Sequence, residues 1–316
     1  YTVGDIWSSS SRGPAADGRM KPNLCAPGRT VTSVAAGTAN GYMDKWGTSM
    51  AAPHVSGIAA TLMEHYSGLT WNPALMRAHL MASTLLHNDD DYWIGNTYGM
   101  GRLSSYLAHW AHDGSNGWST HWSSTDIDMF QYKYMDVTVP SGTDRLVVVL
   151  TWDEPAASSG AADAVDYNLD LYIDRGADCG SGNCGEYSST STIDNVEYRI
   201  IDNPPSGTYR LKVYPTVAPS FLSSPSSLPY GMAAVVIQGD PSPDISFTGW
   251  ASTSTPCKGN TFTITTSVYN PSFIASGVHL EMTGMSSGLT LTGVSTTRED
   301  GVSMNFGTAS QLTLGN

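Results

Sequence analysis

The residues best suited to chemistry lie in segment 47–57, which reads GTSMAAPHVSG. Ser49 stands where a glycine-containing loop passes into a run of helix-compatible residues, so we expect its hydroxyl at a helix N-terminus. The first backbone N–H groups of a helix lack partners within it, and the helix dipole places positive potential there. Negative charge on a nearby substrate oxygen would be stabilised at such a place. The segment therefore predicts a nucleophilic serine, and the simpler alternative is a turn that only caps a helix.

Two helices and one strand are expected to position this serine. Apolar residues recur after it at intervals of three and four, the spacing of one helix face, at Val55, Ile58, Ala59, Leu62, Met63 and Tyr66. This spacing predicts an amphipathic or largely buried helix. A second helix is expected to begin at Pro73, because Asn72 is a good N-cap residue and proline suits the first helical position. A strand is predicted near residues 31–34.

Segment 47–57 strongly resembles the nucleophile motif of the subtilisin-like serine proteases. A second signature of that family stands upstream, as SSRGP at 10–14 continued by KPNLCAPG at 21–28, and YGMGRL at 98–103 resembles the closing turn of its catalytic domain. Asn23 replaces a usual aspartate, and Cys25 occupies a usually aliphatic position. The resemblance implies that Ser49 attacks a peptide carbonyl to form an acyl-enzyme. It also implies that the Ser49 backbone N–H is an oxyanion donor and that Thr48 orients the loop.

The catalytic base of that family has no counterpart at the matching place. In the family an aspartate and a histidine precede the serine along the chain. Here all eight histidines follow Ser49, and the carboxylates upstream of it are Asp5, Asp17 and Asp44. His54 lies five residues after Ser49, an offset that on a helix points it away from the hydroxyl, so a structural role is expected. A serine without a base is a poor nucleophile. We therefore expect this chain alone to be inactive, with the histidine and aspartate supplied by an N-terminal portion of the catalytic domain.

The composition of the chain excludes some classes of binding partner and indicates the compartment of the protein. The chain has 15 Lys plus Arg against 28 Asp plus Glu, a formal charge of −13, which argues against nucleic-acid and anionic-membrane binding. No apolar run approaches the roughly 20 residues that span a bilayer. Charged residues make up only 14% of the chain, which is typical of hydroxyl-covered extracellular proteins. We therefore expect a secreted or cell-surface protein, and the resemblance implies protein or peptide substrates and no cofactor for catalysis.

Three segments are expected along the chain. Residues 1–112 are predicted to be the last part of a parallel-sheet α/β domain. In residues 113–240 the apolar pattern alternates, which predicts a β-sandwich or jelly roll with strands at 145–152, 167–173, 207–214 and 233–237. Residues 243–316 resemble an immunoglobulin-like β-sandwich and are too short for a complete one.

Segment 113–240 also resembles the C-terminal β-barrel of some bacterial alkaline subtilases, and those barrels can bind calcium. Hard oxygen ligands of the kind that calcium prefers are available at Asp153, Asp166, Asn168 and Asp170. Residues at steps of two along a strand share one face, so several of these side chains would lie together. The resemblance therefore implies a structural calcium site, and the alternative is a set of polar edge residues paired with backbone and water.

The cysteines predict one local crosslink. Cys179 and Cys184 flank a glycine-rich turn that can bring their sulfurs together, which favours a disulfide. Two free thiols and half of a metal site are the alternatives. Cys25 is expected to be a buried small hydrophobe.

Two functions follow from these features. The first is a secreted subtilisin-like serine endopeptidase, present here as its serine-bearing portion. The second is a non-catalytic structural or adhesive surface fragment, in which the protease-like part is only a packing module. The sequence does not indicate the substrate preference, because the resemblance implies that the specificity-determining strands lie upstream of residue 1.

Overall fold

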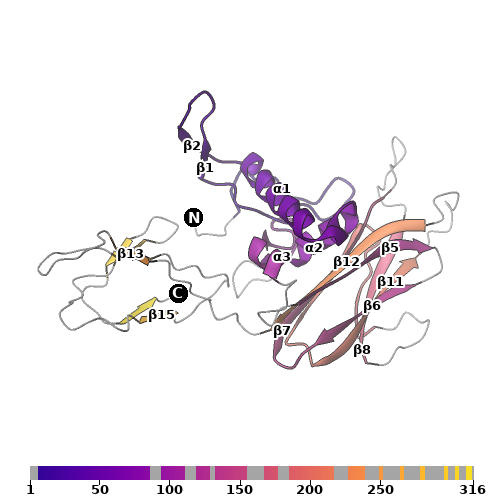
Figure 1. The fold of residues 1–316 in the computed structure, drawn as a ribbon. Coiled ribbons are helices and arrows are strands. Elements are labelled where there is room, and N and C mark those ends of the chain that lie inside the picture. Colours follow the sequence, from indigo (N-terminus) through magenta and orange to yellow (C-terminus); the bar gives the residue numbers. More distant parts are fainter. Residues whose placement is uncertain are drawn as a thin grey trace, which may run out of the picture. The chain divides into compact units, whose positions relative to one another are not determined.

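The computed structural model describes residues 6–85, 94–110, 119–128, 132–154, 167–176, 185–216 and 227–238, together with short strands between 249 and 314 (Figure 1). One compact unit is Ile6–Gly239, and the other contains Asp240–Asn316. The predicted boundary between residues 112 and 113 thus falls inside the first unit. None of the described helices is long and apolar enough to cross a membrane.

The described part of the second unit consists of antiparallel strand pairs. These are β13 (Gly249–Ala251) with β14 (Ile264–Thr266), β15 (Val278–Glu281) with β18 (Gln311–Leu314), and β16 (Ser295–Thr297) with β17 (Ser303–Asn305). This pairing is compatible with the predicted all-β class. The immunoglobulin-like arrangement stays a prediction.

The two predicted helices of the first unit begin where the sequence predicts, and a third, shorter helix follows them. α1 is Thr48–His65 and follows Gly47, whose φ of 132° suits glycine. A short 3₁₀ turn, Ser67–Leu69, leads to α2 (Pro73–Ala82), and the Asn72 side chain accepts a hydrogen bond of 2.8 Å from Leu75 N, which confirms the predicted cap. α3 is Ser105–Trp110.

The two long helices differ in burial. α2 is buried on most sides, whereas Leu62 is the buried residue of α1 and its apolar neighbours Val55, Ile58 and Ala59 are only half-buried. The amphipathic pattern of α1 is therefore present, and the largely buried helix that the sequence also allowed is not formed by the described residues.

The predicted strand near residue 31 forms an antiparallel hairpin instead of joining a parallel sheet. β1 (Val31–Val34) pairs with β2 (Tyr42–Lys45), and β3 (Thr84–Leu85) pairs with β4 (Arg102–Leu103), also antiparallel. The parallel contact among the described residues is a single bridge between Cys25 and Arg102. The parallel sheet of the predicted α/β domain is thus not seen in the described part of the chain.

The largest element is a pair of four-stranded antiparallel sheets, which we call the β-sandwich. One sheet has the order β10-β7-β12-β5, from β5 (Ser119–Asp128), β7 (Thr143–Trp152), β10 (Val196–Asp202) and β12 (Ser227–Gln238). The other has the order β6-β11-β8-β9, from β6 (Lys133–Val139), β8 (Asn168–Arg175), β9 (Tyr187–Ser189) and β11 (Gly207–Thr216). Both sheets contribute to one apolar core, which agrees with the predicted β class. The jelly-roll assignment stays a prediction.

Helix α2 covers the outer face of the first sheet (Figure 1). Alternate residues of β7 point to opposite faces. Val148 and Leu150 therefore enter the core between the sheets, whereas Val147 and Val149 pack with Ala78, Met81 and Ala82 of α2. Thr151 Oγ1 donates a 2.7 Å hydrogen bond to Ala74 O. Burial on both faces explains why β7 reads as a nearly continuous apolar run.

A buried carboxyl group lies within the β-sandwich at Glu197 of β10. Its side chain is 1% exposed, and its oxygens contact the Ser189 hydroxyl and the Ser191 N–H, the latter at 2.6 Å. Burial raises the pKa of Glu197 to about 8, and the charges of Asp170 and Asp194 act in the same direction, against the two hydrogen bonds. Glu197 is therefore protonated in the folded protein at neutral pH.

We expect the free energy of unfolding to fall as pH rises from about 4.5 to about 8, because the folded chain keeps a proton there that the unfolded chain releases. Glu197→Gln retains the size and a neutral donor, so it should remove this pH dependence. It should also raise stability above pH 8 by at least about 2 kcal/mol, since one pKa unit corresponds to about 1.4 kcal/mol. Urea unfolding at several pH values measures this, with the exposed Glu186→Gln as control. An unchanged slope in Glu197→Gln would contradict the assignment.

Candidate active site

The predicted nucleophile stands at the start of α1 and is accessible. Ser49 is the second residue of the helix and is exposed, and its hydroxyl has no hydrogen-bond partner among the described residues. The N–H groups of Thr48 and Ser49 have no carbonyl partner within the helix, as is general for the first turn. Together with the dipole of an 18-residue helix, these groups can stabilise an oxyanion next to Ser49.

The segments that carry the sequence signatures meet beside this serine. Gly47 N donates a 2.7 Å hydrogen bond to Gly28 O, and a Cβ atom on Gly28 would lie 2.8 Å from Gly47 O. Segment 21–28 therefore runs directly against the loop that precedes Ser49. This close approach requires glycine at position 28. The sequence motif includes Gly28 but does not indicate that Gly47 is the residue it contacts.

The other two signatures pack on the same segment. Met100 N donates to Asn23 O at 2.9 Å, and Cys25 N donates to Gly101 O at 2.8 Å. A Cβ atom on Gly99 would overlap the Asn23 carbonyl, and one on Gly13 would overlap the Lys21 carbonyl. Segments 10–14, 21–28 and 98–103 thus form one close-packed layer, and Asn23 and Cys25, the two departures from the family pattern, lie within it.

No histidine of the described residues contacts Ser49. His54 Nδ1 lies 2.8 Å from Met50 O, one turn earlier in α1, as expected for a structural residue. His65 is at the far end of α1, about 24 Å along the axis at 1.5 Å per residue. Burial lowers the pKa of His79 to about 4, and its Nε2 contacts Ala108 O at 3.0 Å. The described residues therefore provide no histidine that could act as a general base for Ser49.

The upstream carboxylates are also engaged elsewhere. Asp17 pairs with Arg19 at 2.7 Å, and Asp44 accepts a hydrogen bond from Thr32 across the hairpin. Asp5 lies outside the described residues. A complete triad cannot be assembled from the described part of this chain.

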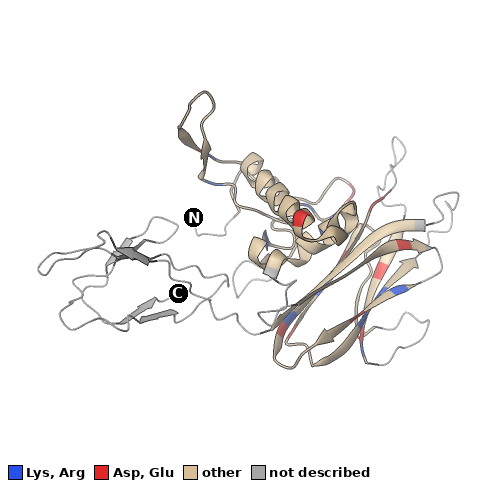
Figure 2. Cartoon of the chain, viewed as in Figure 1, with Lys and Arg blue, Asp and Glu red and all other residues tan. Residues whose placement is uncertain are grey.

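The hairpin that precedes Ser49 along the chain carries exposed apolar side chains. In the hairpin and just after it, Val34, Tyr42 and Trp46 are 74%, 72% and 66% exposed. Figure 2 shows little charge on α1, where Glu64 is the one Asp or Glu and no Lys or Arg occurs. A two-stranded hairpin is marginal by itself, and contiguous exposed apolar side chains mark interaction surfaces. We call Val34, Tyr42 and Trp46, together with the exposed side of α1, the open face.

The predicted calcium ligands are only partly brought together. Asn168 Nδ2 donates to Asp170 Oδ1 at 3.2 Å, and Thr216 donates to the other oxygen of Asp170 at 2.7 Å. Asp153 instead forms an ion pair with Arg77. Asp166 lies outside the described residues, and those that are described contain no group of three or more His, Cys, Asp or Glu side chains arranged for a metal. The structure thus brings Asn168 and Asp170 together and pairs Asp153 with Arg77, and the calcium site stays a prediction.

Of the cysteines considered in the sequence analysis, the structure describes Cys25. Cys179 and Cys184 lie outside the described residues, so their disulfide stays a prediction. Cys25 is a half-buried free thiol whose Sγ lies 3.3 Å from Tyr98 O, and burial raises its pKa to about 11. It packs as a small residue with a weak hydrogen bond.

Comparisons with known proteins find similarity to serine proteases. Residues 1–109 match the model of the Subtilase family. Serine protease/ABC transporter B family protein tagB of Dictyostelium discoideum is 25% identical over 300 residues, covering 69% of this chain and 16% of that protein. Pyrolysin of Pyrococcus furiosus is 38% identical over 94 residues (29% of this chain, 7% of pyrolysin). Serine protease AprX of Bacillus subtilis is 33% identical over 117 residues (32% and 24%). The chain spans less than a quarter of the length of each of these relatives.

Proposed function

We propose that this chain is the serine-bearing portion of a secreted or cell-surface subtilisin-like endopeptidase and that Ser49 is its nucleophile. The observation that carries this proposal is the contact between Gly47 and Gly28, which joins two family-like segments beside an exposed serine at a helix N-terminus. The match of residues 1–109 to the Subtilase family supports it.

The reaction follows from these groups. Ser49 Oγ attacks the peptide carbonyl as its proton passes to a base, and the N–H of Ser49 donates to the oxyanion. The base then protonates the leaving amine, and an acyl-enzyme remains. Water deprotonated by the same base attacks the ester and releases the acid and the free serine. Thr48 holds the loop that presents Ser49.

The histidine and aspartate come from an N-terminal portion of the catalytic domain that covers the open face. The exposed Val34, Tyr42 and Trp46 support this, because burying them would contribute about 1.5–3 kcal/mol for each large apolar side chain. The low charge of α1 supports it as well, since no buried ion pair would be needed on that helix.

A fluorophosphonate probe tests the proposal. We expect the parent protein, with its N-terminal portion, to gain one adduct on Ser49 in intact-mass and peptide analysis, and the isolated chain to gain none under the same conditions. A parent protein that stays unlabelled while folded would contradict the enzyme proposal. Rapid labelling of the isolated chain would contradict the need for a second portion.

The alternative is a structural or adhesive surface fragment. The observation that favours it is the absence of a base near Ser49 among the described residues, beside a large β-sandwich that is packed against the helices. This alternative predicts that the parent protein folds and is not labelled by the fluorophosphonate probe. The same result would contradict the enzyme proposal.

A further inference from the structure

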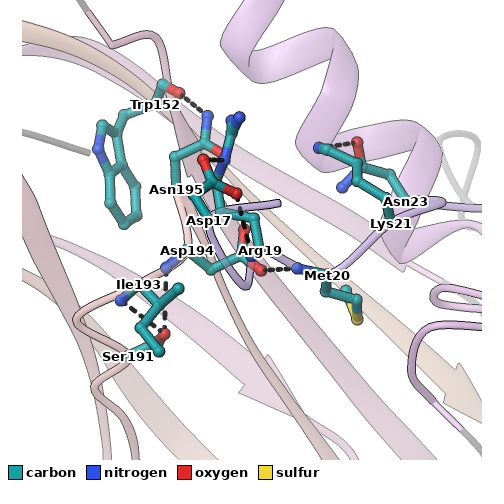
Figure 3. Close-up of polar contacts among 10 residues, drawn as sticks. All are labelled: Asp17, Arg19, Met20, Lys21, Asn23, Trp152, Ser191, Ile193, Asp194 and Asn195. Atoms are coloured by element: carbon teal, nitrogen blue, oxygen red, sulfur yellow. Dashed lines mark hydrogen bonds and ion pairs between the residues drawn. The ribbon is translucent and has the colours of Figure 1, made fainter. Parts of the chain in front are cut away.

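Among the contacts of the β-sandwich with residues 6–110, which we call the serine-bearing part, hydrogen bonds join the two on α2 and again at Met20. On α2, Thr151 donates to Ala74 O, and Arg77 donates to Trp152 O at 3.2 Å. At the second place, shown in Figure 3, Asp194 Oδ2 accepts a 2.6 Å hydrogen bond from Met20 N, across 174 residues of sequence. This second contact reaches the segment that runs to the serine loop.

The turn that carries Asp194, residues 191–195, is itself held by hydrogen bonds (Figure 3). Ser191 Oγ accepts from the N–H groups of Ile193 and Asp194, each at 3.2 Å, and Asn195 Nδ2 donates to Trp152 O at 2.9 Å. Asp194 is 8% exposed. We call this turn the anchor turn. Side chains of the anchor turn are hydrogen-bonded within the turn and to β7, and they hold the Asp194 carboxylate in place toward Met20.

The path from Met20 to the serine is short and has little freedom. Beyond Met20, the backbone at Asn23 and Cys25 is hydrogen-bonded to segment 98–103, and Leu103 N donates to Cys25 O at 2.9 Å. The segment ends at Gly28, whose carbonyl holds Gly47 N. Met20 and Gly47 thus belong to one hydrogen-bonded layer, so loss of the contact at Met20 is expected to loosen the loop that ends at Gly47, two residues before Ser49.

We propose that Asp194 is a positioning residue for Ser49, through which the β-sandwich holds segment 20–28 and the serine loop in register. Asp194 acts through Met20 and does not touch the reacting atoms. The β-sandwich is then part of the scaffold of the serine site. The effect on turnover rests on the proposed function, whereas the effect on the loop does not.

The burial of Asp194 supports this role. Burial raises the pKa of Asp194, and the Met20 N–H together with the positive charge of Lys21 opposes that effect. The groups that oppose the effect of burial on this carboxyl thus come mainly from the segment that Asp194 holds. Removing the carboxyl leaves Met20 N–H without its acceptor.

The test uses Asp194→Ala, the isosteric Asp194→Asn, and Asp202→Asn as control. Asp202 is on β10 of the same sandwich, where it pairs with Arg145 at the exposed surface. Hydrogen exchange in the isolated chain should accelerate at least tenfold at the amides of Met20 and Gly47 in Asp194→Ala, and less in Asp194→Asn, which keeps an acceptor oxygen. Hydrogen exchange in the Asp202→Asn control should equal that of the unsubstituted chain.

In the parent protein, the same variants should lower kcat at nearly constant KM, by about tenfold in Asp194→Ala, with partial recovery in Asp194→Asn. Faster exchange at Met20 with unchanged exchange at Gly47 would overturn the proposal, because the anchor would then act only locally. Faster exchange at both amides in a protein whose Ser49 never labels would leave the positioning intact and refute the proposed enzyme. Loss of fold in both Asp194 variants would also overturn it, since Asp194 would then be a general stability residue.

Discussion

Replacing Ser49 by alanine is expected to remove fluorophosphonate labelling and to lower peptide hydrolysis by the parent protein at least about 10⁴-fold. The substitution deletes the attacking oxygen and leaves α1 and its N-terminal N–H groups in place. In subtilisin, loss of the serine alone costs about 10⁶ in kcat, because the remaining oxyanion donors and substrate binding cannot replace the covalent step. Steady-state kcat on a peptide substrate and adduct mass together measure the effect.

A matched control is available on the same helix. Ser56 is exposed, and its hydroxyl donates only to Ala52 O at 3.3 Å, so Ser56→Ala removes a hydroxyl from α1 without touching its first turn. We expect Ser56→Ala to keep full labelling and activity. Retention of more than a tenth of the activity in Ser49→Ala, with a circular dichroism spectrum like that of the control, would mean that another residue is the nucleophile.

Gly231→Ala is expected to have the largest effect on stability, a loss of about 4 kcal/mol or failure to fold. Gly231 lies on β12, where α2 packs on the sheet, and a Cβ atom there would overlap the backbone N and Cα of Leu75. Overpacking is tolerated where a flexible side chain can move away. Here the obstacle is helix backbone that is buried against the sheet, so α2 would have to lift from β12.

The comparison variant is Gly57→Ala. Gly57 is on the exposed side of α1, and a Cβ atom on it would meet no heavy atom within 4 Å. Both changes are glycine to alanine, so their effects on the unfolded chain are similar, and the difference between them isolates the contact with Leu75. Gly57→Ala should be slightly stabilising in urea unfolding, by up to about 1 kcal/mol. Equal unfolding midpoints for the two variants would refute the close packing of α2 on β12.

Some features could be predicted from the sequence because they depend on neighbours within a few residues. The serine at a helix start, the Asn72 cap and the apolar run that forms β7 are of this kind. Ser49 could be proposed as a nucleophile for the same reason, since its motif contains both the turn and the helix that present it. The absence of an upstream histidine could likewise be read from residue order alone.

Other features depend on partners that are distant along the chain. The expected parallel sheet at residue 31 is an antiparallel hairpin among the described residues, because local spacing predicts a strand and does not choose its neighbour. The ion pair of Asp153 with Arg77 of α2 is of this kind, because the sequence around Asp153 does not indicate a partner 76 residues away. Nothing near Asp194 in the sequence indicates Met20.

By itself, the sequence determined which residues are able to do chemistry and which segments are helices or strands, because backbone propensity, capping and apolar periodicity act over three or four residues. Only the tertiary structure decided that Gly28 meets Gly47, that Gly231 meets Leu75 and that Asp194 holds Met20. These contacts arise when segments that are distant along the chain pack on one another and on the β-sandwich. Burial of apolar surface is non-directional, so the pairing of remote polar groups is settled only by the shape of the packed core.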